Sequence, residues 1–332
     1  MSGERHEDAH GTPSPLVEAR DPRVRILVLK LGALGNIVLS LSAFAAIRRH
    51  HADAEITLLT TAPYADWMAA SPYFDRVVLD QRPAWWDLPG VLRLRRMFAE
   101  GRYQLVYDLQ TSGRSSRYFR LFPRRARPEW SGIAPGCSHP DRDPERDHIH
   151  DVDRQHGQLR QAGITDIPPA DLSWCQGDLS RFDLPPRIAL LVLGSSPHRP
   201  QKRWPAALYR QLAQTLAERG ITPVVLGASG EGELAAAVCR DTPARDLTGR
   251  TSFGDLADLG RRAELAVGND TGPMHLLAVA GCPCLVLFSA DSEPARCAPR
   301  GRWVRTLQRP NLADLPLDAV LDALPEPAEA RS

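Results

Sequence analysis

Residues 264–289 read ELAVGNDTGPMHLLAVAGCPCLVLFS, and this stretch decides the fold class. An apolar, strand-like run ends in a polar turn, a helical pattern follows from 273 to 280, and a second apolar run completes the unit. Pro273 suits the first turn of a helix, where a missing N–H leaves no bond unmade. Strand–helix–strand units of this kind build parallel sheets with helices on their faces. The stretch therefore predicts a doubly wound α/β fold.

The same alternation extends upstream of this unit. Strands are expected in RIALLVLGSS (187–196) and ITPVVLG (221–227), and helical patterns cover 205–219, 231–239 and 253–262. Gly220 directly follows the first of these helices, as a helix-ending glycine does. Together these segments predict one complete parallel sheet in the C-terminal half of the chain.

A second set of strands and helices occupies the N-terminal half. VRILVLK (24–30) is a continuous β-branched and leucine run, typical of a strand buried on both faces. The loop LGALGN, a helical pattern at 37–50, strand-like runs at 55–61, 76–80 and 104–110, and a helix near 64–70 follow it. Residues 114–156 are rich in Arg, Pro and His, and long loops broken by short elements are expected there.

The boundary between the two halves is predicted near a segment with four prolines, 168–186. Residues 23–178 would form an N-terminal Rossmann-like domain, and residues 179–325 a C-terminal one. Residues 1–22 are polar and charged, which favours a disordered tail over a signal peptide or anchor. Two Rossmann-like doubly wound parallel-sheet domains facing a central cleft form the arrangement called GT-B.

Composition excludes several classes of protein. The 332 residues include 41 basic and 40 acidic ones, a net charge of +1, which argues against a nucleic-acid binder. Six scattered cysteines without paired C-x-x-C units favour a reduced, cytoplasmic compartment. The longest apolar stretch, 276–290, is shorter than the roughly 20 residues that a membrane-spanning helix needs.

Thr271 and Gly272 follow the expected strand directly and precede a helix. A helix N-terminus at the carboxyl end of a parallel strand offers free N–H groups and a positive dipole end to a diphosphate. The alternative is an ordinary capped helix, in which Asp270 and Thr271 satisfy only their own turn. The local pattern leaves both interpretations open.

Two further loops carry charge at the same expected sheet edge. SSPHRPQKRWP begins at Ser195 and brings Arg199, Lys202 and Arg203 ahead of a helix, where cations neutralise a diphosphate leaving group without a metal. A solvated basic loop is the alternative. GASGEGE (227–233) places Glu231 where a carboxylate can hold ribose hydroxyls. The alternative there is a glycine turn capped by an acidic first helical turn.

LGALGN lacks the glycine spacing of a dinucleotide fingerprint, and the second strand ends in threonines rather than an acid, so NAD binding is disfavoured. The sequence also contains no P-loop, no G-x-S-x-G elbow and no H-E-x-x-H motif.

Taken together, ILVLKLGALGN, KRWP, GASGEGELA and GNDTGPMHLLAVAGCPCLVLFS resemble glycosyltransferase family 9, the ADP-heptose:lipopolysaccharide heptosyltransferases. The resemblance covers residues 24 to about 302. It implies an inverting transfer of heptose from ADP-heptose to an inner-core sugar of lipopolysaccharide, with no metal and no cofactor. By position it assigns Lys202 to the donor phosphates, Glu231 to the nucleoside, and Asp270, Thr271, Gly272 and His275 to the diphosphate-binding turn. His275 lies inside the helix, so a packing histidine is the alternative.

The sequence departs from the family at one position. The family usually has an Asp after the glycine of the first loop, which resembles a general base, and this chain has Asn36. Asn and Asp cap helices about equally well, so the fold is expected to tolerate the change. A neutral amide takes no proton near pH 7. Asp108 is the candidate substitute base. The alternative is that its carboxylate only caps the turn that follows the strand. A catalytically silent nucleotide-sugar-binding homologue and a transferase for another donor remain as alternatives.

The acceptor is expected to bind the N-terminal half. Arg114, Arg117 and Arg120 recur at a spacing of three, which on a helix would align them along one face for an anionic core sugar. WWDLPGVLRLRRMF (85–98) mixes aromatic, apolar and basic residues, as does a helix resting on an anionic membrane. The respective alternatives are a solvated basic face and a helix that only covers a sheet edge. Peripheral contact with the inner membrane is the corresponding prediction.

Overall fold

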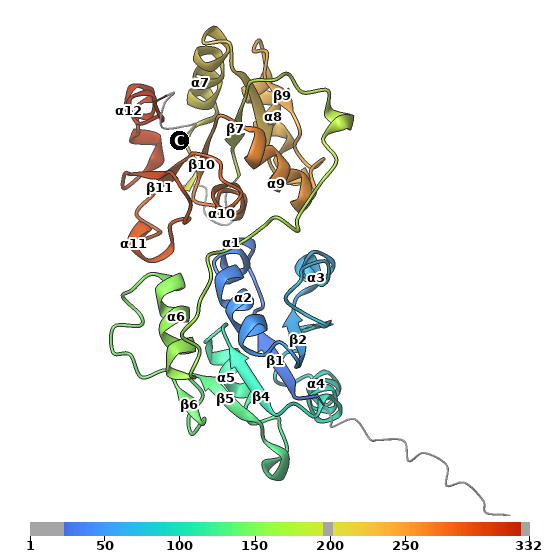
Figure 1. Cartoon of the computed structure of the whole chain (residues 1–332). Helices are drawn as coiled ribbons and strands as arrows, with labels where there is room; N and C mark the ends of the chain where they lie inside the picture. Colours follow the sequence, from blue (N-terminus) through green and yellow to red (C-terminus); the bar gives the residue numbers. More distant parts are fainter. Residues whose placement is uncertain (1–22, 195–201, 327–332) are drawn as a thin grey trace, which may run out of the picture.

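The computed structural model describes residues 23–194 and 202–326. Two six-stranded sheets, parallel throughout, form its two halves, which confirms the predicted doubly wound α/β class (Figure 1). The strand orders are β3-β2-β1-β4-β5-β6 and β12-β11-β10-β7-β8-β9. In each sheet the first strand of that half is central and is paired on both sides. The predicted tail, residues 1–22, lies outside the described residues.

The first half contains β1 (Arg25–Leu29), β2 (Glu55–Thr60), β3 (Arg76–Leu79), β4 (Leu105–Asp108), β5 (Glu129–Gly132), β6 (His139–Pro140), α1 (Leu34–Val38), α2 (Leu41–His50), α3 (Ala62–Ala69), α4 (Leu88–Gly101), α5 (Gly113–Tyr118) and α6 (Asp151–Gln161). The helix expected over 37–50 is two helices. The hydroxyl of Ser40 donates to the carbonyl of Asn36 at 2.7 Å, a local bond that bends or interrupts helices.

The second half contains β7 (Ile188–Val192), β8 (Thr222–Leu226), β9 (Arg245–Asp246), β10 (Leu265–Asn269), β11 (Cys284–Phe288), β12 (Val304–Gln308), α7 (Ala206–Glu218), α8 (Gly232–Cys239), α9 (Phe253–Arg262), α10 (Gly272–Val279), α11 (Pro294–Cys297) and α12 (Leu317–Asp322). Strands β7, β10 and β11 are buried along their whole length. These three strands were predicted from their apolar runs, and the structure buries both faces of each.

The region expected to be mostly loops, residues 114–156, also supplies two strands of the first sheet. Strand β5 extends the sheet beyond β4, and the two-residue β6 extends it further. Trp130 in β5 is fully buried against Phe119 and Phe122. The strands are too short for a visible sequence period, and packing against their neighbours decides them.

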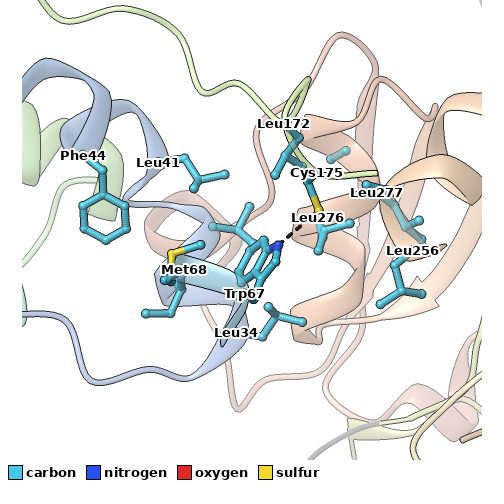
Figure 2. Close-up of a cluster of buried hydrophobic side chains, with 14 of the residues drawn as sticks. Leu34, Leu41, Phe44, Trp67, Met68, Leu172, Cys175, Leu256, Leu276 and Leu277 are labelled. Carbon is cyan, nitrogen blue, oxygen red and sulfur yellow. Dashed lines mark hydrogen bonds between the residues drawn. The ribbon is translucent and has the colours of Figure 1, made fainter. Parts of the chain in front are cut away.

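One hydrophobic cluster joins the two halves. Trp67 of α3 lies between Leu34 of α1, Leu276 of α10 and the connecting segment, where its indole N–H donates to the thiol of Cys175 at 3.1 Å (Figure 2). A fully buried Trp or Leu contributes roughly 2 to 3 kcal/mol of burial free energy. The halves are thus packed against each other at the carboxyl edges of their sheets.

Candidate active site

The turn after β10 begins with a buried amide. Asn269 is fully buried, and its Oδ1 accepts from the backbone N–H of Trp204 at 3.0 Å and from the hydroxyl of Tyr209 at 3.3 Å. Its Nδ2 donates to the carbonyl of Leu193 at 2.7 Å. One side chain thereby ties the end of β10 to the end of β7 and the start of α7. The sequence motif includes this residue, but sequence reasoning gave it no role.

Helix α10 starts without a side-chain cap. Thr271 occupies the N-cap position in extended conformation, and its side chain makes no capping bond. Among the described residues, the backbone N–H groups of Thr271 and Gly272 have no hydrogen-bond partner. The interpretation in which Asp270 and Thr271 satisfy only their own turn therefore does not describe this helix start. Two donors and the positive end of the helix dipole remain available for an anion.

Lys202 reaches this helix start from a distant part of the chain. Its Nζ donates to Oδ2 of Asp270 at 3.0 Å and to the hydroxyl of Ser292. The lysine is largely buried, so its ammonium is a fixed positive charge beside the helix start. Two residues that the sequence assigned to one site, 68 positions apart, are in direct contact. Through this contact the Asp270 carboxylate orients the lysine within the turn.

Glu231 lies between the ends of β7 and β8. A Cβ added at Gly194 would come within 2.3 Å of its Oε1, and one at Gly227 within 2.7 Å of its Oε2. Both glycines are therefore needed for the carboxylate to occupy this place. The N–H of Ala228 also donates to Oε2 at 2.8 Å, so Glu231 caps its own turn. Its contact with a nucleoside stays a prediction.

His275 connects the two halves. Its buried ring lies where a side chain on Gly35 would be, with Cδ2 at 2.9 Å from that Cβ position. Burial lowers its pKa to about 4, and the nearby Asp270 carboxylate opposes this shift. The imidazole is therefore neutral near pH 7 and supplies no positive charge to a diphosphate. Its Nδ1 is buried and has no hydrogen-bond partner among residues 23–194 and 202–326, so the ring packs without being fully satisfied there.

Asn36 lies at the same junction but does not cap a helix. Ala33 is the N-cap of α1, and Asn36 is the third helical residue. Its Nδ2 donates to the carbonyl of Gly32 at 3.4 Å, a long bond. The expectation that Asn36 caps a helix is wrong, because α1 begins at Leu34, three residues before the predicted Ile37.

Asp108 is fully buried at the end of β4. Its Oδ1 accepts from the N–H of Thr111 at 2.9 Å, and its buried Oδ2 has no hydrogen-bond partner in the described part of the chain. Burial raises its pKa to about 7. The carboxylate holds the turn that leads to α5, which is the alternative considered for it, and it has no exposed surface from which to reach an acceptor.

The three arginines of the proposed acceptor face do not share one helix. Helix α5 ends at Tyr118, so Arg120 lies beyond it. Arg114 and Arg117 instead stack their guanidinium groups on the ring of Trp85, at 5.3 and 5.4 Å from its centroid. The alignment expected from spacing alone was therefore wrong for Arg120, because α5 is only six residues long.

The remaining predicted residues are placed as follows. Arg203 is half-buried next to Lys202 in sequence, whereas Ser195 and Arg199 lie outside the described residues. A further buried cation, Lys30, follows β1 and donates to the carbonyl of Leu109 at 3.0 Å. Burial lowers its pKa to about 8. Sequence reasoning missed it, although Lys30 and Lys202 are the only two lysines among the 41 basic residues.

Two general features were searched over residues 23–194 and 202–326. No group of three or more His, Cys, Asp or Glu side chains there is arranged to hold a metal ion. Nor does any helix in this part of the chain have the length and apolar character to cross a bilayer.

Comparison with known proteins identifies the family. The model of glycosyltransferase family 9 (heptosyltransferase) matches residues 91–313. The lipopolysaccharide core heptosyltransferase OpsX of Haemophilus influenzae is 22% identical over 295 residues, 82% of this chain and 81% of that protein. Lipopolysaccharide heptosyltransferase 3 of Escherichia coli is 23% identical, covering 78% of this chain and 80% of its own.

Solved structures show the same fold. Escherichia coli ADP-heptose lps heptosyltransferase II superposes with a TM-score of 0.71 at 20% identity, covering 90% of this chain and 97% of its own. A family 9 glycosyl transferase from Veillonella parvula superposes with a TM-score of 0.70 at 24% identity, over 86% of each chain. With the family model matching most of its length, the chain belongs to glycosyltransferase family 9, the heptosyltransferase family.

Proposed function

We propose that the protein transfers heptose from ADP-heptose to an inner-core sugar of lipopolysaccharide. The observation that carries this proposal is the contact of Lys202 with Asp270 beside the open start of α10. The names of the relatives support the choice of sugar and acceptor. Similar folds are found in Escherichia coli heptosyltransferase WaaC with ADP and with ADP-2-deoxy-2-fluoro heptose. Glu231, at the ends of β7 and β8, would hold the nucleoside.

The geometry suits departure of a diphosphate without a metal. As the bond between the sugar and the diphosphate breaks, negative charge grows on the leaving oxygen. Two backbone N–H groups, the dipole of α10 and the Lys202 ammonium would stabilise that charge in a largely desolvated place. Lys202 would exchange its carboxylate partner for the phosphate. Direct attack by the acceptor hydroxyl from the opposite side of the sugar carbon would invert the configuration.

Asn36 favours one rival, a homologue that binds nucleotide sugars and transfers nothing. The usual base position of the family is occupied by an amide, and Asp108 is fully buried. Donor specificity is a separate question, because a diphosphate site of this kind is shared by transferases for other sugars.

Calorimetry and an assay of transfer test the proposal. We expect ADP to bind and GDP and UDP to bind at least ~10-fold more weakly, a difference of about 1.4 kcal/mol. We also expect intact mass to show one heptose added to a lipopolysaccharide core acceptor. No heat with any nucleoside diphosphate would contradict the site itself. Normal ADP binding without transfer would instead support the silent homologue.

The acceptor side is proposed to lie against the inner membrane through α4. Trp86, two residues before α4, is 85% exposed, and Leu88 and Leu92 near the start of the helix are 67% and 61% exposed. The exposed Arg95 and Arg96 follow on the same helix. Apolar side chains beside arginines match a lipid surface with anionic headgroups, where the rings and chains insert and the cations stay at headgroup level.

The arginines proposed for the acceptor adjoin this surface. Arg114 and Arg117 stack on Trp85, the residue immediately before Trp86. A lipid-linked acceptor would then keep its chains in the bilayer while its anionic sugars meet these guanidinium groups. Replacing Arg117 with Ala is expected to raise the KM for acceptor and leave donor affinity intact, and equal loss of both would contradict the assignment.

Vesicle sedimentation tests the membrane contact. A Trp86→Ser, Leu92→Ser double variant is expected to bind vesicles containing phosphatidylglycerol at least ~10-fold more weakly than the unmodified protein, because each removes an inserted apolar side chain. Val24→Ser is the matched control, since Val24 is a half-exposed apolar residue at the amino end of β1. The proposal would be contradicted if all three proteins sedimented equally with the vesicles, or if none of them sedimented.

A further inference from the structure

The proposed transfer requires the Lys202 ammonium to stay beside the start of α10 after phosphate has replaced its carboxylate partner. In the structure Asp270 and the hydroxyl of Ser292 hold Nζ. When the donor takes the place of Asp270, one of these two bonds is lost, and a lysine stem is long and flexible. The position of the ammonium then depends on how firmly the neighbouring backbone is fixed.

The backbone close to Lys202 is fixed through Trp204, which is almost fully buried. The indole N–H donates to the carbonyl of Leu315 at 2.9 Å, and the ring packs edge-on against Tyr209, with 4.8 Å between the ring centroids. The backbone N–H of Trp204 donates to Oδ1 of Asn269 at 3.0 Å. Two residues after the lysine, the chain is thus held both by packing and by Asn269.

The side-chain amide of Asn269 can adopt only one orientation here. Its Nδ2 donates to the carbonyl of Leu193 at 2.7 Å, and its Oδ1 accepts from Trp204 and, at 3.3 Å, from the hydroxyl of Tyr209. A flipped amide would direct its NH2 group at the Trp204 N–H and its oxygen at the Leu193 carbonyl. The fully buried side chain is therefore rigidly held.

The same residue adjoins the turn that starts α10. Asn269 ends β10, and Asp270 and Thr271 follow it directly. Its side chain is therefore bonded to the segment that carries Lys202, while its backbone continues into the turn. A single residue sets the spacing of these two parts of the donor site. This link does not use the bond between Lys202 and Asp270, so it persists when phosphate replaces the carboxylate.

We propose that Asn269 is a positioning residue that holds the Lys202 ammonium at the start of α10, an inference that rests on the proposed transfer. Asn269 is fully buried, so it contacts neither substrate and acts through the backbone N–H of Trp204. With Asn269 in place, the ammonium faces the diphosphate as negative charge grows on the leaving oxygen. A charge that is already in position stabilises the transition state without reorganisation at the moment of reaction.

A double-mutant cycle tests this role in the complete chain. Asn269→Leu keeps the approximate volume and removes both hydrogen-bonding groups. We expect it to lower kcat/KM for the donor at least ~10-fold, because a misplacement of about 1 Å can cost ~10²-fold. In the Lys202→Met background the same change should cost less than ~3-fold, since no ammonium is left to position. Equal losses in the two backgrounds would show that Asn269 only supports the fold, and would overturn the role.

The affinity for ADP repeats the cycle without turnover. Asn269→Leu should weaken ADP binding at least ~3-fold in the unmodified background and less than ~1.5-fold alongside Lys202→Met. The Kd for adenosine should stay the same in all four proteins. Additive losses of ADP affinity, or a parallel loss of adenosine binding, would contradict the role. Failure of the unmodified protein to bind ADP would instead contradict the proposed function.

Tyr209→Phe is the matched control, because it removes a hydrogen bond to the same oxygen of Asn269 and leaves the Trp204 bond in place. We expect its kcat/KM to stay within about threefold of the unmodified value. Asn269→Asp keeps an acceptor for the Trp204 N–H and should retain at least ~3-fold more activity than Asn269→Leu. If leucine prevents folding, Asn269→Ser, whose side chain is shorter, completes the same cycle. A loss in Tyr209→Phe as large as that in Asn269→Leu would overturn the role.

Discussion

Replacing Lys202 with methionine is expected to lower kcat/KM for the donor by about 10²- to 10³-fold, the usual cost of removing one group that stabilises a developing anion. Methionine keeps most of the buried stem and removes only the charge. The ammonium is held by Asp270 and Ser292 beside the open start of α10, so no other described lysine can take its place. Initial rates across donor concentrations measure the change.

Two comparisons make this prediction specific. Lys202→Arg should recover part of the rate, because charge is restored but the planar guanidinium fits a site built for a compact ammonium poorly. The Kd for adenosine, which lacks phosphates, should be the same in all three proteins. A methionine variant with unchanged kcat/KM, or with adenosine affinity lost in parallel, would show that Lys202 only supports the fold.

Replacing Gly272 with alanine is expected to destabilise the protein by about 1 to 3 kcal/mol through overpacking. A Cβ at this position would lie 2.7 Å from Cβ of Leu34 in α1. Neither atom is the end of a flexible side chain, so α10 and α1 must move apart. Alanine keeps the backbone N–H that is proposed to bind the diphosphate, but the forced shift of α10 would move that N–H out of place. ADP affinity should therefore also fall, by about 10-fold if one good hydrogen bond is misplaced.

Gly232 provides the control. It is the first residue of α8, as Gly272 is of α10, and a Cβ there would meet nothing within 4 Å. Gly232→Ala should therefore be neutral or stabilising by up to about 1 kcal/mol, since alanine restricts the unfolded chain. Thermal unfolding and ADP calorimetry compare the two variants. Equal effects would mean that contact with Leu34 is unimportant.

The sequence by itself determined the local features of both halves. The continuous apolar runs at 24–30 and 284–288 predicted strands, the first of them buried on both faces, and the structure has both strands. The turn before Pro273 predicted the start of α10. These features depend on neighbours within a few residues, and periodicity and turn chemistry record such neighbours directly. Strand β5 and helix α6, by contrast, lie in a stretch whose composition suggests loops.

Tertiary structure alone decided which side chains meet. Strand β10 pairs with β7, and this order brings the loop after β7, with Lys202, to the turn that contains Asp270. Contact of the two halves buries His275 against Gly35. Packing within the first half, around the turn at Thr111, encloses Asp108, which the sequence had offered as a base. Such outcomes depend on sheet order and on the docking of distant surfaces, which no local pattern encodes.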